Sequence, residues 1–350
     1  MKPPQLRFVP ASLSLGTALL IGATVVGGVG AAATDSSAAR LPGEGVVSQS
    51  LSQAVDFPQE CRLFPRKNYW NTRIDKLPLH RRSKAWTGAI GDSGSLHPDF
   101  GPSFGEQSEP YGIPLTVVDG SHARVPVSFY YDDESDRVRY PLGTGTRIEG
   151  GLESDGDRHA IVVDRDSCTL FETYDTRPAG GAWEAGSGAV WSLRSNTLRP
   201  EGWTSADAAG LPILPGLLRY EEVASGSVRH AIRFTAPRTR KQYIWPARHF
   251  ASSDTSSALP PMGARFRLAR NFSLQGWSPQ ARTVLRAMKR YGLVLADNGS
   301  PWYFQGTADS RWPIDLVDEL KAIPASAFEA VRSQKLRISS ESARARQLRR

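Results

Sequence analysis

Short runs of alternating hydrophobic and polar positions recur from about residue 57 to residue 331 and predict β-strands. The alternation is clearest where Val125, Val127, Phe129 and Tyr131 fall at every second position, which places them on one face of a sheet. Gly, Pro, Asp and Ser separate the runs, as is typical of a sandwich or jelly roll. The other predicted strands are 113–118, 160–164, 168–174, 188–193, 228–235, 265–268 and 293–296.

One helical pattern follows these strands. Ser278 suits the N-cap, Pro279 the first turn and Gly292 the end of a helix. The apolar residues at helical spacing between them are Val284, Leu285, Met288 and Tyr291. A second, shorter helix is expected over 314–322. The chain is therefore predicted to be mainly β, a single-domain β-sandwich or jelly-roll-like fold over residues 57–331 with long loops and one or two C-terminal helices.

Three long stretches lack a regular pattern, over 81–111, 177–187 and 236–261. Connections in compact domains are usually much shorter. Long ordered loops commonly form the walls of a functional site. These stretches are therefore the expected surroundings of a site.

The N-terminus has the order of a secretory signal. Lys2 and Arg7 precede an uncharged stretch over 8–33 that ends in three alanines, which predicts a signal peptide over residues 1–33. A membrane anchor is the alternative, because the stretch is long enough to span a bilayer. Residues 34–56 are rich in small and polar residues and predict a disordered spacer. We therefore expect a secreted, extracellular protein with no membrane span after cleavage.

The two cysteines, Cys61 and Cys168, are expected to form a disulfide in an oxidising compartment. Closing a loop of this size constrains the unfolded chain by roughly 4 to 5 kcal/mol, so a structural role is sufficient. A catalytic thiol or a two-cysteine zinc site is the alternative.

The net charge of +8 is concentrated at the two ends of the chain. Residues 332–350 contribute +6, and Lys2 and Arg7 contribute +2, which leaves the body neutral. A neutral body argues against a nucleic-acid groove built into the fold. The tail over 332–350 is polar and predicted to be disordered, either in contact with an anionic cell-surface polymer or without a partner.

The sharpest candidate geometry is a hairpin with its turn at 164–167. A turn centred on residues 165 and 166 would set His159 opposite Glu172, and strand alternation would add Tyr174 to the same face. Such a group suits proton transfer. A half-buried His–Glu pair with only a structural role is the alternative.

A second candidate group is formed by a strand over 229–234 and the segment over 243–249. His230 is expected on one strand face and Arg233 on the other, with Trp245 and His249 in the following segment. Together with His159, the histidines His230 and His249 would make a metal site in a minority interpretation. Their spacing matches no short ligand motif, so no metal or cofactor is predicted.

Nine tryptophans are a high number for this length, and several stand in Gly-, Pro- and Asp-rich loops. Flat apolar rings beside polar groups suit the faces of sugars. Trp191 is expected in the core. The predicted sugar platforms are Trp183, Trp203 and Trp302.

Four motifs carry a resemblance over about residues 140–312. They are SDGDRH at 154–159, WTSADAAGLPILPGL at 203–217, WPARH at 245–249 and ADNGS at 296–300. With them the chain resembles a group of secreted bacterial proteins that has no established activity. The resemblance implies secretion and a shared fold, and it transfers no catalytic residue.

The sequence favours a secreted glycoside hydrolase acting on a polysaccharide, with Glu172 and Asp157 as the acid and the base or nucleophile. His159, His230 and Arg233 would orient the sugar or stabilise charge. A polysaccharide lyase is an alternative, with His159 or His230 as base, Tyr174 as acid and arginines on the uronate carboxylate. A non-catalytic protein that binds glycan or cell wall, and a metal-dependent hydrolase, are the further alternatives.

Overall fold

The structure is a computed structural model that describes residues 55–103 and 110–348. All of them belong to the compact unit formed by residues 50–350. The predicted signal peptide and residues 34–54 of the predicted spacer lie outside the described residues. Val55 packs against the core and Asp56 pairs with Arg311, so the last two residues assigned to the spacer are part of the fold.

The largest sheet has six strands in the order β1-β12-β9-β11-β10-β13. Neighbours β1 and β12, and β9 and β11, are parallel, and the other neighbours are antiparallel. The central strand β9 is buried along its whole length, including its polar residues Arg233 and Thr235. The bounds are β1 His97–Asp99, β9 Ile232–Ala236, β10 Arg265–Leu268, β11 Leu293–Asn298, β12 Tyr303–Gln305 and β13 Phe328–Ala330.

Two smaller sheets have the strand orders β2-β4-β5-β8 and β3-β7-β6. The four-stranded sheet is covered on both faces: Ile161 and Leu170 join the main core, while Val162 and Phe171 join a second core with Tyr140. The bounds are β2 Leu115–Val118, β3 Val127–Phe129, β4 Ala160–Asp164, β5 Thr169–Tyr174, β6 Arg177–Ala179, β7 Ala182–Ala185 and β8 Ser187–Ser192.

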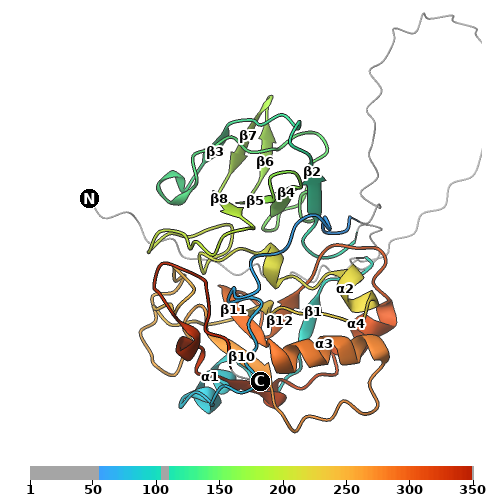
Figure 1. The fold of residues 1–350 in the computed structure, drawn as a ribbon, viewed down its shortest axis with the longest axis vertical. Helices are drawn as coiled ribbons and strands as arrows, with labels where there is room; N and C mark the ends of the chain where they lie inside the picture. The colour runs from blue at the N-terminus through green and yellow to red at the C-terminus, as the bar shows by residue number, and fades with distance from the viewer. Residues whose placement is uncertain (1–54, 104–109, 349–350) are drawn as a thin grey trace, which may run out of the picture. The chain divides into compact units, whose positions relative to one another are not determined.

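Helices are few (Figure 1). The longest, α3 (Pro279–Arg290), is capped as predicted, because the Ser278 side chain accepts a hydrogen bond from the Ala281 amide. Gly292 follows with φ of +74°, and a Cβ there would collide with the Phe266 carbonyl. The others are α1 Ser83–Ile90, α2 Tyr220–Ala224 and α4 Ile314–Leu320, with short 3-10 turns η1 Asp132–Glu134, η2 Leu214–Gly216, η3 Ala325–Ala327 and η4 Ser333–Leu336.

The predicted fold class is confirmed: the chain is mainly β, with curled, sandwich-like sheets and few helices. The strand pairing is mixed, whereas immunoglobulin-type sandwiches are antiparallel. Two of the stretches expected to be irregular contain helices or strands. The stretch over 81–111 includes α1 and β1, and the stretch over 177–187 includes β6 and β7. The segment over 237–261 is irregular, as expected.

The predicted disulfide is present. A disulfide joins Cys61 to Cys168, with a Cα–Cα distance of 5.5 Å. The two residues are 107 positions apart in the sequence. The disulfide ties the start of the domain to the turn between β4 and β5. No helix in the described ranges is both long enough and apolar enough to cross a bilayer.

The prediction of a disordered tail is wrong over residues 332–348. Leu336 and Ala345 are buried in the main core, and the Tyr69 amide donates to the Ala343 carbonyl at 2.8 Å. The segment has few large apolar residues, but those few fill existing gaps in the core, and its backbone pairs with residues 67–69. The folded domain therefore continues well beyond Val331.

Candidate functional site

A buried histidine marks the start of the candidate site. His159 directly precedes β4, and its Nδ1 lies 2.5 Å from Glu149 Oε2 while its Nε2 lies 3.1 Å from the Ala206 carbonyl. Burial opposes a charge on the ring, but the Glu149 carboxylate outweighs burial and raises the pKa of His159 to about 9. At neutral pH His159 is therefore an imidazolium that pairs with the Glu149 side chain.

A buried arginine on β9 links the six-stranded sheet to the segment over 205–214. Arg233 Nη2 donates to Asp207 Oδ1 at 3.1 Å and lies 4.0 Å from Asp297 Oδ2 at the end of β11. Its Nη1 donates to the Gln305 side chain on β12. Asp207 is fully buried and its second oxygen has no hydrogen-bond partner among the described residues. Burial raises the pKa of Asp207 against the lowering effect of Arg233.

A third carboxyl extends the group along β1. Asp99 accepts a hydrogen bond from the Tyr111 hydroxyl and another, at 3.1 Å, from Gln305 Nε2. Burial, together with the neighbouring Glu149 carboxylate, raises the pKa of Asp99 against these two hydrogen bonds. Glu149 also acts electrostatically on Arg233, which joins the pairs into one group. We call this group the polar cluster: Asp99, Tyr111, Glu149, His159, Asp207, Arg233, Asp297 and Gln305.

Part of the polar cluster reaches solvent. The side chains of Glu149 and Asp297 are 25% and 24% exposed, whereas those of Arg233 and Asp207 are 1% and 0% exposed. Burial and the nearby Asp207 carboxyl raise the pKa of Asp297 to about 7, against the effect of Arg233. The accessible rim therefore offers one carboxyl, Asp297, that holds its proton near neutral pH, and a second carboxyl, Glu149, that is paired with the His159 imidazolium.

The segment over 205–214 positions much of this group. The Ala206 carbonyl of this segment lies within hydrogen-bond distance of His159 Nε2, and Asp207 accepts a hydrogen bond from Arg233. The Ala209 amide donates to the Ala296 carbonyl on β11 at 2.9 Å. Gly210 makes the segment turn with φ of +66°, where a Cβ would collide with the Trp203 carbonyl. The segment therefore bonds to both larger sheets at the polar cluster.

Glu172 does not have the predicted catalytic position. It is fully buried on β5 and its carboxylate accepts hydrogen bonds from the Ile213 and Leu214 amides at 2.8 Å. Burial raises its pKa to about 7 although those amides lower it. A carboxylate without exposed area cannot touch a polymer, so Glu172 is a structural acceptor that holds the segment over 205–214.

The predicted hairpin is present with a shifted register. Ile161 lies opposite Glu172 and Val163 opposite Leu170, with residues 165–168 in the turn, so His159 is not opposite Glu172. A shift by two residues preserves the strand face, and the His159 and Tyr174 rings lie 5.8 Å apart. Burial and Asp157 raise the pKa of Tyr174 to about 12. Asp157 is exposed at the rim and acts electrostatically on His159 and Asp297.

His230 and His249 do not converge with His159. His230 is buried between Glu222, 2.9 Å from its Nε2, and the Ala231 carbonyl. His249 is half-buried, and its Nδ1 lies 2.9 Å from the Ala208 carbonyl. These separate partners exclude a shared metal site for the three rings. Over the described ranges, no group of three or more His, Cys, Asp or Glu side chains is arranged to hold a metal ion.

Two of the three predicted sugar platforms, and Trp245 of the second candidate group, are core residues. Trp302 is 1% exposed among Phe234 and Phe266, and Trp183 packs in the second core. Trp245 is buried and donates to the Ser342 carbonyl. Trp203 keeps partial exposure beneath Arg199, and Trp191 is buried as predicted. Gly and Asp near a tryptophan did not indicate exposure here, because long loops of this fold are themselves packed.

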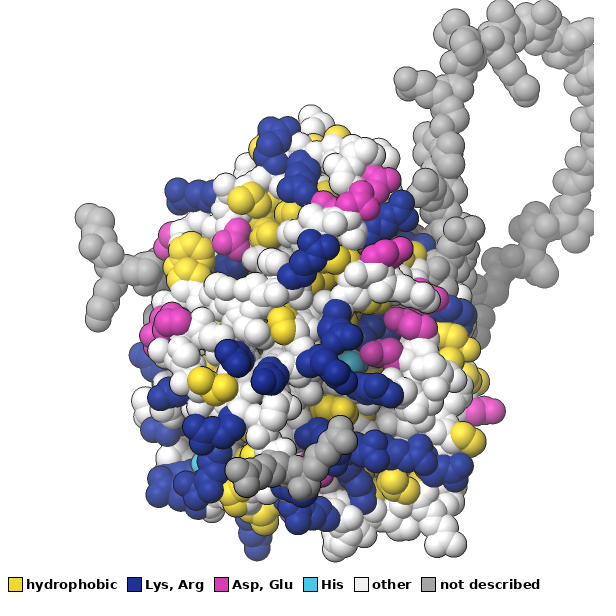
Figure 2. All heavy atoms as spheres, viewed as in Figure 1, with side chains coloured by type: hydrophobic (Ala, Val, Ile, Leu, Met, Phe, Trp, Pro, Cys, Tyr) yellow, Lys and Arg dark blue, Asp and Glu magenta, His cyan; other side chains and the backbone are white. Residues whose placement is uncertain are grey.

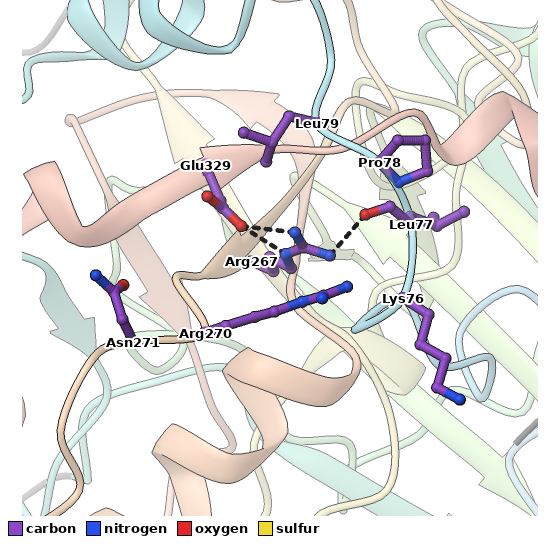
Figure 3. Close-up of a pocket in the computed structure, with 8 residues that line it drawn as sticks. All are labelled: Lys76, Leu77, Pro78, Leu79, Arg267, Arg270, Asn271 and Glu329. Carbon is purple, nitrogen blue, oxygen red and sulfur yellow. Dashed lines mark hydrogen bonds and ion pairs between the residues drawn. The ribbon is translucent and has the colours of Figure 1, made fainter.

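A pocket of about 460 Å³ lies elsewhere, between the segment over 76–79 and β10 (Figure 3). Its central cation, Arg267, is bonded to Glu329 at 2.7 Å and to the carbonyls of Ile74 and Leu77. Arg270 donates to a backbone carbonyl as well. Because the charged groups of this pocket bond to the protein's own carboxylate and carbonyls, we assign them a role in stabilising the fold. The polar cluster is therefore the candidate functional site.

Sequence reasoning missed Asp99, Glu149, Asp207 and Asp297. Asp207 lies inside the WTSADAAGLPILPGL motif and Asp297 inside the ADNGS motif. The motifs therefore contained two residues of the polar cluster, but the sequence does not show that these residues lie close together in the fold. The four carboxyls come from segments that are far apart in the sequence, and no motif with a fixed spacing relates such segments.

No protein-family model, curated protein or solved structure matches this chain. The function is therefore argued from the geometry of the polar cluster.

Proposed function

We propose that this protein is a secreted glycoside hydrolase that cleaves an extracellular polysaccharide at the polar cluster. The observation that carries the proposal is the pair of partly exposed carboxyls, Asp297 and Glu149, both of which act electrostatically on the buried Arg233. Their environments differ, and hydrolysis of a glycosidic bond requires one protonated and one ionised carboxyl at the same site.

The roles follow from the environments. Asp297 is the general acid, because its pKa of about 7 lets it keep a proton to donate to the leaving oxygen. Glu149 is the base or nucleophile, and its Oε2 lies 2.5 Å from Nδ1 of the buried His159 imidazolium. His159 and Arg233 are positioning residues, since both are buried and neither reaches a polymer.

The half-exposed tyrosines around the carboxyls suit sugar rings. Tyr111 is hydrogen-bonded to Asp99, and Tyr303 stacks on His97 with ring centroids 4.0 Å apart. Such rings offer an apolar face and a polar edge. They replace the buried tryptophans as the proposed sugar platform.

The lyase alternative has weaker support. It requires a neutral base and a cation against the uronate carboxylate. His159 is protonated at neutral pH, and Arg233, the cation of the polar cluster's ion pair with Asp207, is buried. A hydrolase needs neither group in contact with substrate.

The test is product release from plant, fungal and bacterial-wall polysaccharides by the purified protein and three variants. We expect Asp297→Asn and Glu149→Gln each to lose on the order of 10²- to 10⁴-fold in activity, because each removes one proton-transfer group. Asp133→Asn, an exposed aspartate in η1, is the matched control and should keep full activity. Wild-type activity should fall as pH rises past about 7, when Asp297 loses its proton.

Full activity in folded Asp297→Asn and Glu149→Gln proteins would overturn the assignment. Binding to a glycan without any product release would favour the non-catalytic binding protein.

A further inference from the structure

A band of exposed basic side chains surrounds the C-terminal segment. The Ala345 amide donates to the Lys67 carbonyl at 2.7 Å, and the Ile74 amide donates to the Arg290 carbonyl at 2.7 Å. These bonds bring the segment over 66–74, the C-terminal segment and the end of α3 together. The exposed basic residues on them, which we call the basic face, are Arg66, Lys67, Arg286, Arg290, Arg344 and Arg346.

The basic face has no internal counter-charge. Within residues 55–103 and 110–348, none of its six side chains forms an ion pair. Arginines on other segments, such as Arg124 and Arg311, are paired with carboxylates. Figure 2 shows Lys and Arg gathered over α3 and around the C-terminal end, where Asp and Glu are sparse. Clustered charge of one sign raises the local concentration of opposite charge.

The acidic rim and the basic face belong to different parts of the surface. The partly exposed carboxyls of the rim are Glu149, in the segment before β4, and Asp297 on β11, whereas the basic face comes from α3, the segment over 66–74 and the C-terminal segment. The face is therefore suited to hold a polymer outside the reaction site.

We propose that the basic face binds an anionic carbohydrate polymer that bears carboxylate or phosphate groups. This binding retains the protein on the polymer. The choice of a carbohydrate rests on the proposed function. Nucleic acid is disfavoured because Tyr69 and Trp70, the aromatic residues of the adjoining segment, are buried and give no stacking surface for bases.

The experiment measures binding of the purified protein to four probes: polygalacturonate, a glycerol-phosphate teichoic polymer, neutral dextran and single-stranded DNA. The test variant replaces Lys67, Arg290, Arg344 and Arg346 by Gln. The control variant replaces Arg137, Arg165, Arg177 and Arg229 by Gln, which removes the same charge from exposed positions on other segments. Circular dichroism and thermal melting establish that both are folded.

We expect binding to one or both anionic glycans, lost in the test variant by about tenfold or more and kept by the control variant. Binding should also weaken between about 0.05 M and 0.5 M salt, because exposed charges are screened. Tighter binding to polygalacturonate would show that the face recognises carboxylate groups of the polymer. Tighter binding to the teichoic polymer would show that it recognises phosphate groups.

Equal binding by the two variants, no binding to either anionic glycan, or tighter binding to DNA than to both would overturn the proposal. Asp297→Asn separates it from the proposed function, since that variant should bind the polymer as the wild type does while losing hydrolysis. Loss of hydrolysis therefore reports on the polar cluster, and loss of binding reports on the basic face.

Discussion

At the scale of single residues, this fold buries many charged groups and provides each with specific partners. Arg265 is fully buried on β10 and donates to the carbonyls of Tyr69, Thr72 and Tyr291. Long irregular segments leave buried carbonyls that sheets do not pair, and a guanidinium can satisfy several at once. A buried arginine in this protein is therefore most often a structural donor, and Arg233 differs because its partners are carboxyls and an amide side chain.

The His159–Glu149 pair makes stability depend on pH. The pKa of His159 is about 9 in the folded protein against 6.5 in the unfolded chain, so the folded state binds an extra proton between these values. The stabilisation is fully present below pH 6.5 and is lost as pH rises through about 9. We expect the free energy of unfolding to fall by on the order of 3 kcal/mol over this range.

Urea denaturation at several pH values measures this effect. His159→Gln removes the titrating group, and its unfolding free energy should change less between pH 6.5 and 9. A wild-type slope equal to that of His159→Gln would show that the pair is not protonated as described.

At the scale of elements, the N-terminal segment is fixed to the β4–β5 turn by a covalent link rather than by a sheet. Cys61 precedes the first regular element and Cys168 lies in the turn with φ of +52°. The hairpin in turn presents His159 at the start of β4 and Glu172 on β5. The disulfide therefore stabilises the sheet that supports one side of the polar cluster.

Removing the disulfide should lower stability strongly. Cys61→Ser combined with Cys168→Ser opens a loop with a sequence separation of 107. The chain-entropy model gives a loss of roughly 4 to 5 kcal/mol. Urea denaturation of the double variant measures it, with the wild type in excess reductant as a second way to open the link. An unchanged denaturation midpoint would contradict a stabilising role.

At the scale of the whole molecule, the two ends of the described chain pack together. Residues 343–345 pair with 67–69, and Trp245 and Arg248 donate to the carbonyls of Ser342 and Ser340. Leu336 is fully buried in the main core. The last residues therefore close the domain.

Truncation after Val331 should accordingly prevent stable folding. Leu336→Ala is the finer test and should cost about 2 to 5 kcal/mol, because it leaves a cavity in the core. Arg346→Gln, an exposed neighbour without an ion pair among the described residues, should change stability by less than about 0.5 kcal/mol. Thermal melting of the three proteins measures these effects, and a truncated protein that melts like the wild type would contradict them.

Local chemistry determined much of the secondary structure. Strands β4 and β10 have the predicted bounds, and Ser278 and Gly292 delimit α3 as expected. These features depend on side-chain alternation, capping and backbone freedom within a few residues. The pairing of Cys61 with Cys168 was equally determined, because the chain contains no other cysteine.

Only the tertiary structure decided the site. Glu149, Asp207, Asp297 and Asp99 come from four distant segments, and their chemistry arises from burial and mutual charge that no local pattern encodes. The same holds for Glu172, whose partners lie 41 and 42 residues away, and for the C-terminal segment, whose few apolar side chains fill gaps made by other elements. Local forces shape strands and turns, whereas the protonation and exposure of a side chain depend on everything packed around it.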